Sequence, residues 1–147
     1  MEAIGRKEMG RKYARESTMK LLYQMEINSD FTEDAIGIFF ENYTFDERER
    51  LYIEDAVETI IKNLKDIDFY IQNNIEGWEI HRLARVDLSI LRIAIYEMLY
   101  RKDIPIQVSI NEAIEISKKY STEESSKFIN GVLGGFVRSG VLEDSGR

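Results

Sequence analysis

The chain has 147 residues and a formal net charge of −7, with no cysteine and one histidine. A chain of this length buries about 70% of its unfolded surface as a single domain, so it needs neither disulfides nor metals to fold. The lack of cysteine excludes disulfides, thiol nucleophiles and thiolate zinc sites, and a lone His81 leaves no histidine cluster for a metal or a catalytic relay. We therefore expect no cofactor.

The charge is unevenly distributed along the chain. Residues 1–20 contain six basic and three acidic side chains, so the excess of acidic residues lies in the rest of the protein. Because salt screens charges over about 8 Å, a basic patch here attracts phosphate despite the distant negative charge. A solvated helix start explains the same charges equally well.

No stretch approaches the roughly 20 apolar residues of a membrane span, and the N-terminus lacks the apolar core of a secretory signal. We expect a cytoplasmic protein that does not contact membranes.

The first third of the chain predicts two helices after a mobile basic arm. Residues 1–9 lack apolar periodicity and form the arm. Helical spacing of apolar residues predicts a helix over about 11–28, with Arg11 displayed at its start. A shorter aromatic helix follows over about 32–43.

A third helix is expected to begin after Thr44 or Asp46, with Leu51 among its inward residues. The sequence leaves open whether this helix continues to about residue 73 or breaks near Asp66. Trp78 follows a loop, where a core plug is a more frequent role for tryptophan than recognition.

The stretch from about residue 87 to residue 101 is predicted to be the central helix. Apolar residues leave only a narrow polar strip through Ser89, Arg92 and Tyr96, which indicates a helix enclosed on most sides. Asp87 is expected to cap its first turn, and Pro105 stops it.

Two further helices are expected over 106–120 and over about 123–138. Glu115 and Lys119 are four residues apart, so they are expected to form an ion pair on the solvent-exposed side of the helix over 106–120. Ser121 or Thr122 is expected to cap the second. Gly131 lies in mid-helix, where glycine costs about 1 kcal/mol relative to alanine, so we expect a closely approaching neighbour there.

The chain shows neither the alternation of strands nor an internal repeat. We predict one all-α domain over residues 1–147, with about seven helices in two packed bundles around the buried central helix.

These segments resemble the NusB family of bacterial transcription antitermination factors. The resemblance rests on motifs that occur in order from about residue 11 to residue 136: Arg11-Lys12-x-Ala14-Arg15-Glu16, Leu22-Tyr23-Gln24, Ile90-Leu91-Arg92-Ile93-Ala94-x-Tyr96-Glu97, Asp103-Ile104-Pro105, Ile110-Asn111-Glu112-Ala113 and Lys127-Phe128-x-Asn130-Gly131-Val132-Leu133.

The resemblance implies two three-helix bundles and no catalysis. It also implies a partnership with a small-subunit ribosomal protein acting as NusE, with which the protein binds single-stranded boxA RNA of ribosomal RNA leaders and joins the antitermination complex on RNA polymerase. The RNA contacts it implies are Arg11, Lys12, Arg15, Arg92, Tyr120, Glu124, Lys127 and Phe128. The partner contacts it implies are Tyr23, Ile27 and Asp87.

The sequence departs from the family pattern at Tyr13, where a third basic residue is common, and at Glu124 and Gly134. The implied contacts still suit an RNA strand, because aromatic and guanidinium groups stack on unpaired bases and a carboxylate such as Glu124 accepts from a base amino group. Core packing is the competing role for Phe128.

Two other interpretations stay open. One is a detached NusB-like module of a ribosomal RNA methyltransferase, although the chain lacks a glycine-rich cofactor loop and a nucleophilic cysteine. The other is a helical homodimer that covers its basic arm.

Overall fold

The computed structural model describes the backbone of residues 2–147 and the side chains of residues 10–147. All regular secondary structure in these residues is helical, which confirms the predicted all-α class. The elements are α1 (Glu2–Asn28), α2 (Glu33–Asn42), α3 (Glu47–Lys62), α4 (Leu64–Gln72), the 3₁₀ turn η1 (Ile80–Arg82), α5 (Arg85–Tyr100), α6 (Ile106–Tyr120), α7 (Glu123–Arg138) and α8 (Val141–Asp144).

The first helix begins at Glu2, earlier than the predicted start near Arg11. We expected residues 1–9 to form a mobile arm. Met1 and the side chains of residues 2–9 lie outside the described part of the chain, so this mobility stays a prediction. The third helix breaks at Asn63 and α4 follows at once. The start of α3 is fixed by a reciprocal cap, in which Asp46 accepts from Glu49 N and Glu49 accepts from Asp46 N.

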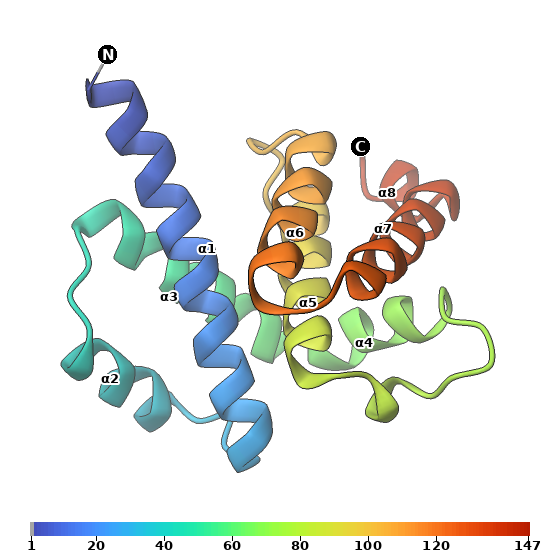
Figure 1. The fold of residues 1–147 in the computed structure, drawn as a ribbon, viewed down its shortest axis with the longest axis horizontal. Coiled ribbons are helices and arrows are strands. Elements are labelled where there is room, and N and C mark those ends of the chain that lie inside the picture. Colours follow the sequence, from blue (N-terminus) through green and yellow to red (C-terminus); the bar gives the residue numbers. More distant parts are fainter. Residues whose placement is uncertain (1) are drawn as a thin grey trace.

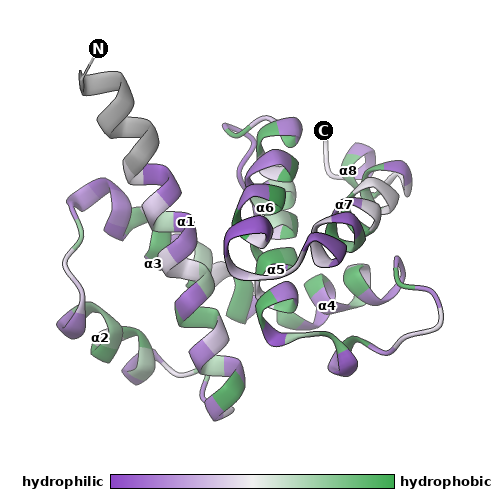
Figure 2. Ribbon diagram, in the orientation of Figure 1, coloured by the Kyte–Doolittle hydropathy of each residue, from purple (hydrophilic) through white to green (hydrophobic). Residues whose placement is uncertain are grey.

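Helix α5 joins two groups of helices (Figure 1). On one side it packs against α1 and α3, and α2 lies against α1. On the other side it packs against α4, α6 and α7. Hydrophobic residues occupy much of α5 (Figure 2), and every residue from Asp87 to Met98 is buried. The expected central helix is therefore confirmed.

The predicted polar strip of this helix is buried as well. Ser89, Arg92 and Tyr96 are all enclosed, and each has a polar partner. Arg92 donates to Asp68 of α4 and Tyr96 to Asp55 of α3, whereas the Ser89 hydroxyl donates to the Arg85 carbonyl within α5 itself. The expected cap by Asp87 is wrong: α5 starts after Ala84, and the Asp87 carboxylate accepts instead from the start of α7.

For several other side chains the predicted burial or the predicted ion-pair partner was wrong. Leu51 is 60% exposed and its neighbour Tyr52 is buried instead, because the Tyr52 hydroxyl finds a buried acceptor in Glu97. Trp78 is 57% exposed and does not plug the core. Lys119 pairs with Glu16 of α1, and Glu115 pairs with Lys118.

The close approach expected at Gly131 occurs one turn later. A Cβ on Gly131 would meet nothing within 4 Å, and this residue is exposed. A Cβ on Gly135 would lie 2.7 Å from Asn74 Oδ1, so it is Gly135 that lets the segment after α4 reach α7. Asn74 is itself fixed by a hydrogen bond to Tyr70 O.

Candidate nucleic-acid interface

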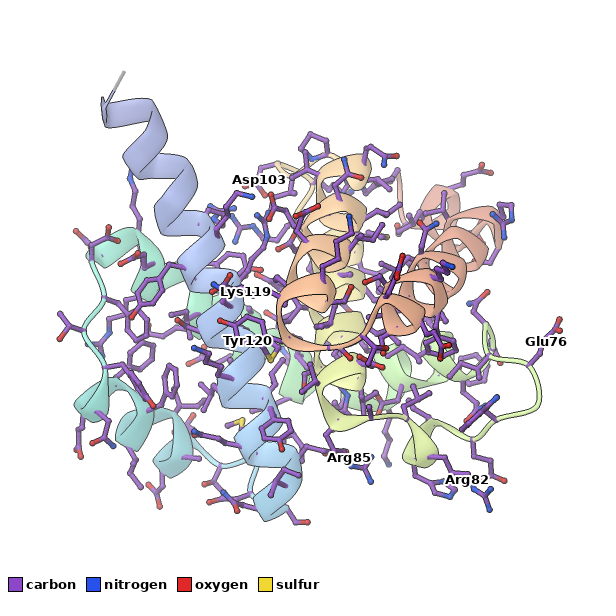
Figure 3. The ribbon with its side chains drawn as sticks, viewed as in Figure 1. Glu76, Arg82, Arg85, Asp103, Lys119 and Tyr120 are labelled. Atoms are coloured by element: carbon purple, nitrogen blue, oxygen red, sulfur yellow. The ribbon has the colours of Figure 1, made fainter. Side chains whose placement is uncertain are left out.

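The C-terminal end of α6 lies against the middle of α1. The Glu16 carboxylate accepts from Lys119 Nζ at 3.1 Å and from the Tyr120 hydroxyl at 3.0 Å. Figure 3 shows Lys119 and Tyr120 at this end of α6, beside α1. The hydrogen bond to Glu16 raises the pKa of Lys119, so this amine is charged at neutral pH. The contact joins the basic part of α1 to the α6–α7 corner.

Two of the predicted RNA contacts lie on α1 just before this junction. Lys12 is exposed, and its Nζ lies 3.0 Å from Glu112 of α6. The Arg11 guanidinium is partly exposed and lies over the Tyr52 ring, 4.9 Å from its centroid. This stacking fixes the direction of the Arg11 side chain at low energetic cost, because the cation faces the negative face of the ring.

The start of α7 is held in place by a network of hydroxyl groups. Thr122 Oγ1 accepts from Ser125 N at 3.0 Å and so caps the helix, as one of the two predicted caps. Asp87 of α5 accepts from Ser121 and Ser125, each at 2.8 Å. Because Asp87 is buried, this network fixes the α7 start rigidly to the central helix.

This fixed turn presents the predicted α7 residues. Glu124 and Lys127 are exposed, whereas Phe128 is partly buried against the core. Only part of the Phe128 ring is accessible to a base. We use the name corner surface for those predicted RNA contacts that are exposed or partly exposed, namely Arg11, Lys12, Tyr120, Glu124, Lys127 and Phe128.

Arg15 does not belong to the corner surface. Its guanidinium is buried, and Nε lies 2.7 Å from Glu97. Burial alone lowers the pKa of Arg15, but the hydrogen bond and charge of Glu97 outweigh it and raise this pKa above its ordinary value. Glu97 also accepts from Tyr52 and Ser109. A direct RNA contact by Arg15 does not fit this placement.

Arg92 is enclosed in the same way. It donates to both carboxylate oxygens of Asp68, at 2.9 and 2.8 Å, and its Nη1 lies 3.5 Å from Glu26. These contacts tie α5 to α4 and to α1. The guanidinium plane predicted to stack on a base is therefore buried, and this prediction also does not fit the structure.

The three predicted partner contacts separate into two groups. Tyr23 and Ile27 lie one turn apart on α1 and are 37% and 55% exposed, so they form one apolar face. Asp87 is buried and engaged with Ser121 and Ser125, so it offers no surface to a partner.

Sequence reasoning missed Lys20 and the roles of Glu16 and Lys119. The signal was present, because Lys12, Glu16 and Lys20 recur every four residues and so share one face of α1. In the structure Lys20 Nζ lies 5.4 Å from the centroid of the Tyr120 ring.

Within the described residues, no group of three His, Asp or Glu side chains is placed to hold a metal ion. None of the helices that the structure describes is both long enough and apolar enough to cross a bilayer.

Comparison with known proteins gives a consistent result. The profile of the NusB family matches residues 12–138. A transcription antitermination protein NusB of Acetivibrio thermocellus is 48% identical over 138 residues, covering 94% of this chain and 95% of that protein. One of the same name from Listeria monocytogenes is 46% identical, covering 85% and 94%.

Two solved structures are also similar. NusB of T. maritima is 40% identical, with a TM-score of 0.80 over 87% of this chain and 90% of that one. A chain in a crystal structure of NusB and NusE with double-stranded RNA has a TM-score of 0.80 over 89% and 98%, and at 24% identity it shows the shared fold.

Proposed function

The chain belongs to the NusB family, and from that premise we propose that it is a non-catalytic, RNA-binding adaptor of transcription antitermination. It acts in the cytoplasm, where transcripts are made, and it binds unpaired boxA-type leader RNA of ribosomal RNA operons. The observation that carries this proposal is the junction at Glu16, which brings the basic part of α1 beside the α6–α7 corner.

The corner surface supplies the two kinds of group that a single strand needs. Arg11, Lys12 and Lys127 provide cations for phosphates, and the accessible parts of Tyr120 and Phe128 provide faces or edges for unstacked bases. Glu124 repels phosphate but accepts from a base amino group, so it discriminates among bases.

Arg15 and Arg92 act indirectly in this proposal. Their buried pairs with Glu97 and Asp68 hold α1, α4 and α5 together beneath the surface. Their contribution to RNA binding is therefore a contribution to folding and to the placement of α1.

The protein partner is NusE, which accompanies NusB in the structural neighbour that contains double-stranded RNA. We propose that it docks on the apolar face formed by Tyr23 and Ile27, beyond Lys20 on the same helix. The assembly then joins the antitermination complex on RNA polymerase. RNA binding by the adaptor alone is weak because acidic residues predominate outside residues 1–20.

A titration of labelled boxA-type RNA and of a scrambled RNA, with and without NusE, tests the proposal. We expect weak binding alone, and tighter binding with a preference for boxA when NusE is present. Equal affinity for both RNAs in the presence of NusE contradicts the proposal.

Light scattering on the same samples tests the homodimer, which competes with RNA if it covers the basic residues. A methyl-transfer assay on ribosomal RNA is expected to show no activity.

A further inference from the structure

We propose that Lys20, Lys119 and the Tyr120 ring between α1 and α6 form an additional phosphate-binding subsite of the RNA surface, and that Glu16 blocks it in the free protein. This inference rests on the proposed function. It extends the corner surface along α1 with two lysines that the family motifs do not include.

The first observation is the arrangement of cations around one aromatic ring. Lys20 Nζ and Lys119 Nζ lie 5.4 Å and 5.3 Å from the centroid of the Tyr120 ring. Both lysines are exposed. The Tyr120 ring thus gathers two exposed ammonium groups at one place on the surface, and clustered cations suit the phosphates of a nucleic-acid strand.

The second observation is the carboxylate at the centre of the cluster. Both oxygens of Glu16 lie 3.1 Å from Lys119 Nζ, and one accepts from the Tyr120 hydroxyl. A phosphate offers the same negative oxygens to the same donors. Glu16 thus occupies the position of an RNA phosphate, and RNA must displace it from Lys119.

The third observation is the groove beside the cluster. It has a volume of about 340 Å³ between α1 and α6 and is lined by Lys12, Glu16, Glu112, Glu115, Lys118 and Lys119, with Ile116. Each of its lysines is paired with a carboxylate, Lys12 with Glu112 and Lys118 with Glu115. The groove is therefore close to neutral in the free protein, and its cations become available only when a phosphate replaces a carboxylate.

The effect of Glu16 on RNA affinity follows from the strength of its ion pair with Lys119. An exposed ion pair is weak, and losing one changes an affinity by at most about fivefold. Glu16 is 21% exposed and Lys119 is 60% exposed, so this range applies. Replacing Glu16 by Gln removes the charge but leaves an acceptor for Tyr120, and should therefore tighten RNA binding about threefold to fivefold.

The test measures the affinity of a short labelled single-stranded RNA at several salt concentrations. The variants are Lys20→Ala with Lys119→Ala, and separately Glu16→Gln. The control is Lys62→Ala with Lys65→Ala, which removes the same charge from exposed positions on α3 and the start of α4. Thermal unfolding of each variant shows that it is folded at the assay temperature.

We expect the Lys20 and Lys119 variant to bind about tenfold more weakly for boxA and scrambled RNA alike, with the salt slope reduced by about 0.7 per lysine. Affinity equal to that of the Lys62 and Lys65 control overturns the subsite. Unchanged or weaker binding by Glu16→Gln overturns the blocking role of Glu16.

A separate variant distinguishes failure of this inference from failure of the proposed function. Lys127→Ala lies on α7, outside the cluster. If it weakens RNA binding while the Lys20 and Lys119 variant matches its control, the proposed function stands and the subsite is wrong. If the unmodified protein does not bind the RNA even with NusE, the proposed function is wrong.

Discussion

Replacing Arg15 by Met should destabilise the fold by about 3 kcal/mol or more. Arg15 and Glu97 are both buried, with relative exposures of 5% and 1%. Removing one partner of a buried pair costs about 3–5 kcal/mol, because the other charge is left without compensation. Tyr52 and Ser109 still donate to Glu97, which places the expectation at the lower end of this range.

Urea unfolding at neutral pH measures this free energy, with RNA affinity determined under conditions where the variant is folded. Adding Glu97→Gln to Arg15→Met should recover at least half of the lost stability, since it removes the uncompensated charge while retaining an acceptor. A loss of less than about 1 kcal/mol together with a clear loss of RNA affinity refutes the reasoning, because Arg15 would then be an RNA contact with little structural role.

Two further predictions concern the helical glycines and the buried tyrosines. Gly131→Ala should raise the free energy of unfolding by about 1 kcal/mol, because the residue is exposed in mid-helix with open space around its Cα. Gly135→Ala should give no such gain, since its Cβ would displace Asn74, and equal effects of the two substitutions in urea unfolding contradict this. Burial raises the pKa of Tyr52, with a further contribution from Glu97, and burial also raises that of Tyr96. Above pH ~10 the unfolded chain therefore binds fewer protons than the folded one, and stability falls as pH rises. Tyr52→Phe should make this fall shallower in unfolding measured across pH, and an unchanged slope contradicts the assignment.

Local signals in the sequence predicted the helices well where one face dominates. The bounds of α6 and the course of α7 agree with the structure, because apolar spacing, a hydroxyl cap and the stop at Pro105 act within a few residues. The sequence left open whether the third helix continues or breaks near Asp66, because apolar residues continue across this region. The structure places the break at Asn63, where α4 packs against α5 as a separate helix.

The site was predicted only in part, because contacts between residues far apart in the chain are not visible in the sequence. Lys12 and Lys127 are exposed where the family motifs place them, and Glu124, which departs from the family pattern, is exposed as well. The burial of Arg15 could not be seen, because its partner Glu97 is 82 residues away in the chain. The sequence shows that a residue is charged, but not whether it is buried in an ion pair with a residue far away in the chain.

The same limit applies to the other corrections. Leu51 and Tyr52 are neighbours, and only the distant Glu97 explains why the tyrosine is the buried one. Gly131 and Gly135 are equally unusual within a helix, and only the position of Asn74 distinguishes them. In each case a long-range partner decided between residues that local periodicity treats alike.

The most direct test of the central claim is a titration of the protein with short single-stranded RNA, followed by its backbone amide NMR spectrum. We predict that amides of the α1 segment 11–20 and of the α6–α7 corner, residues 119–128, shift together with one apparent affinity. Shifts confined to one of these segments, or shifts on α2 with no change at the corner, contradict the claim that one RNA strand contacts both.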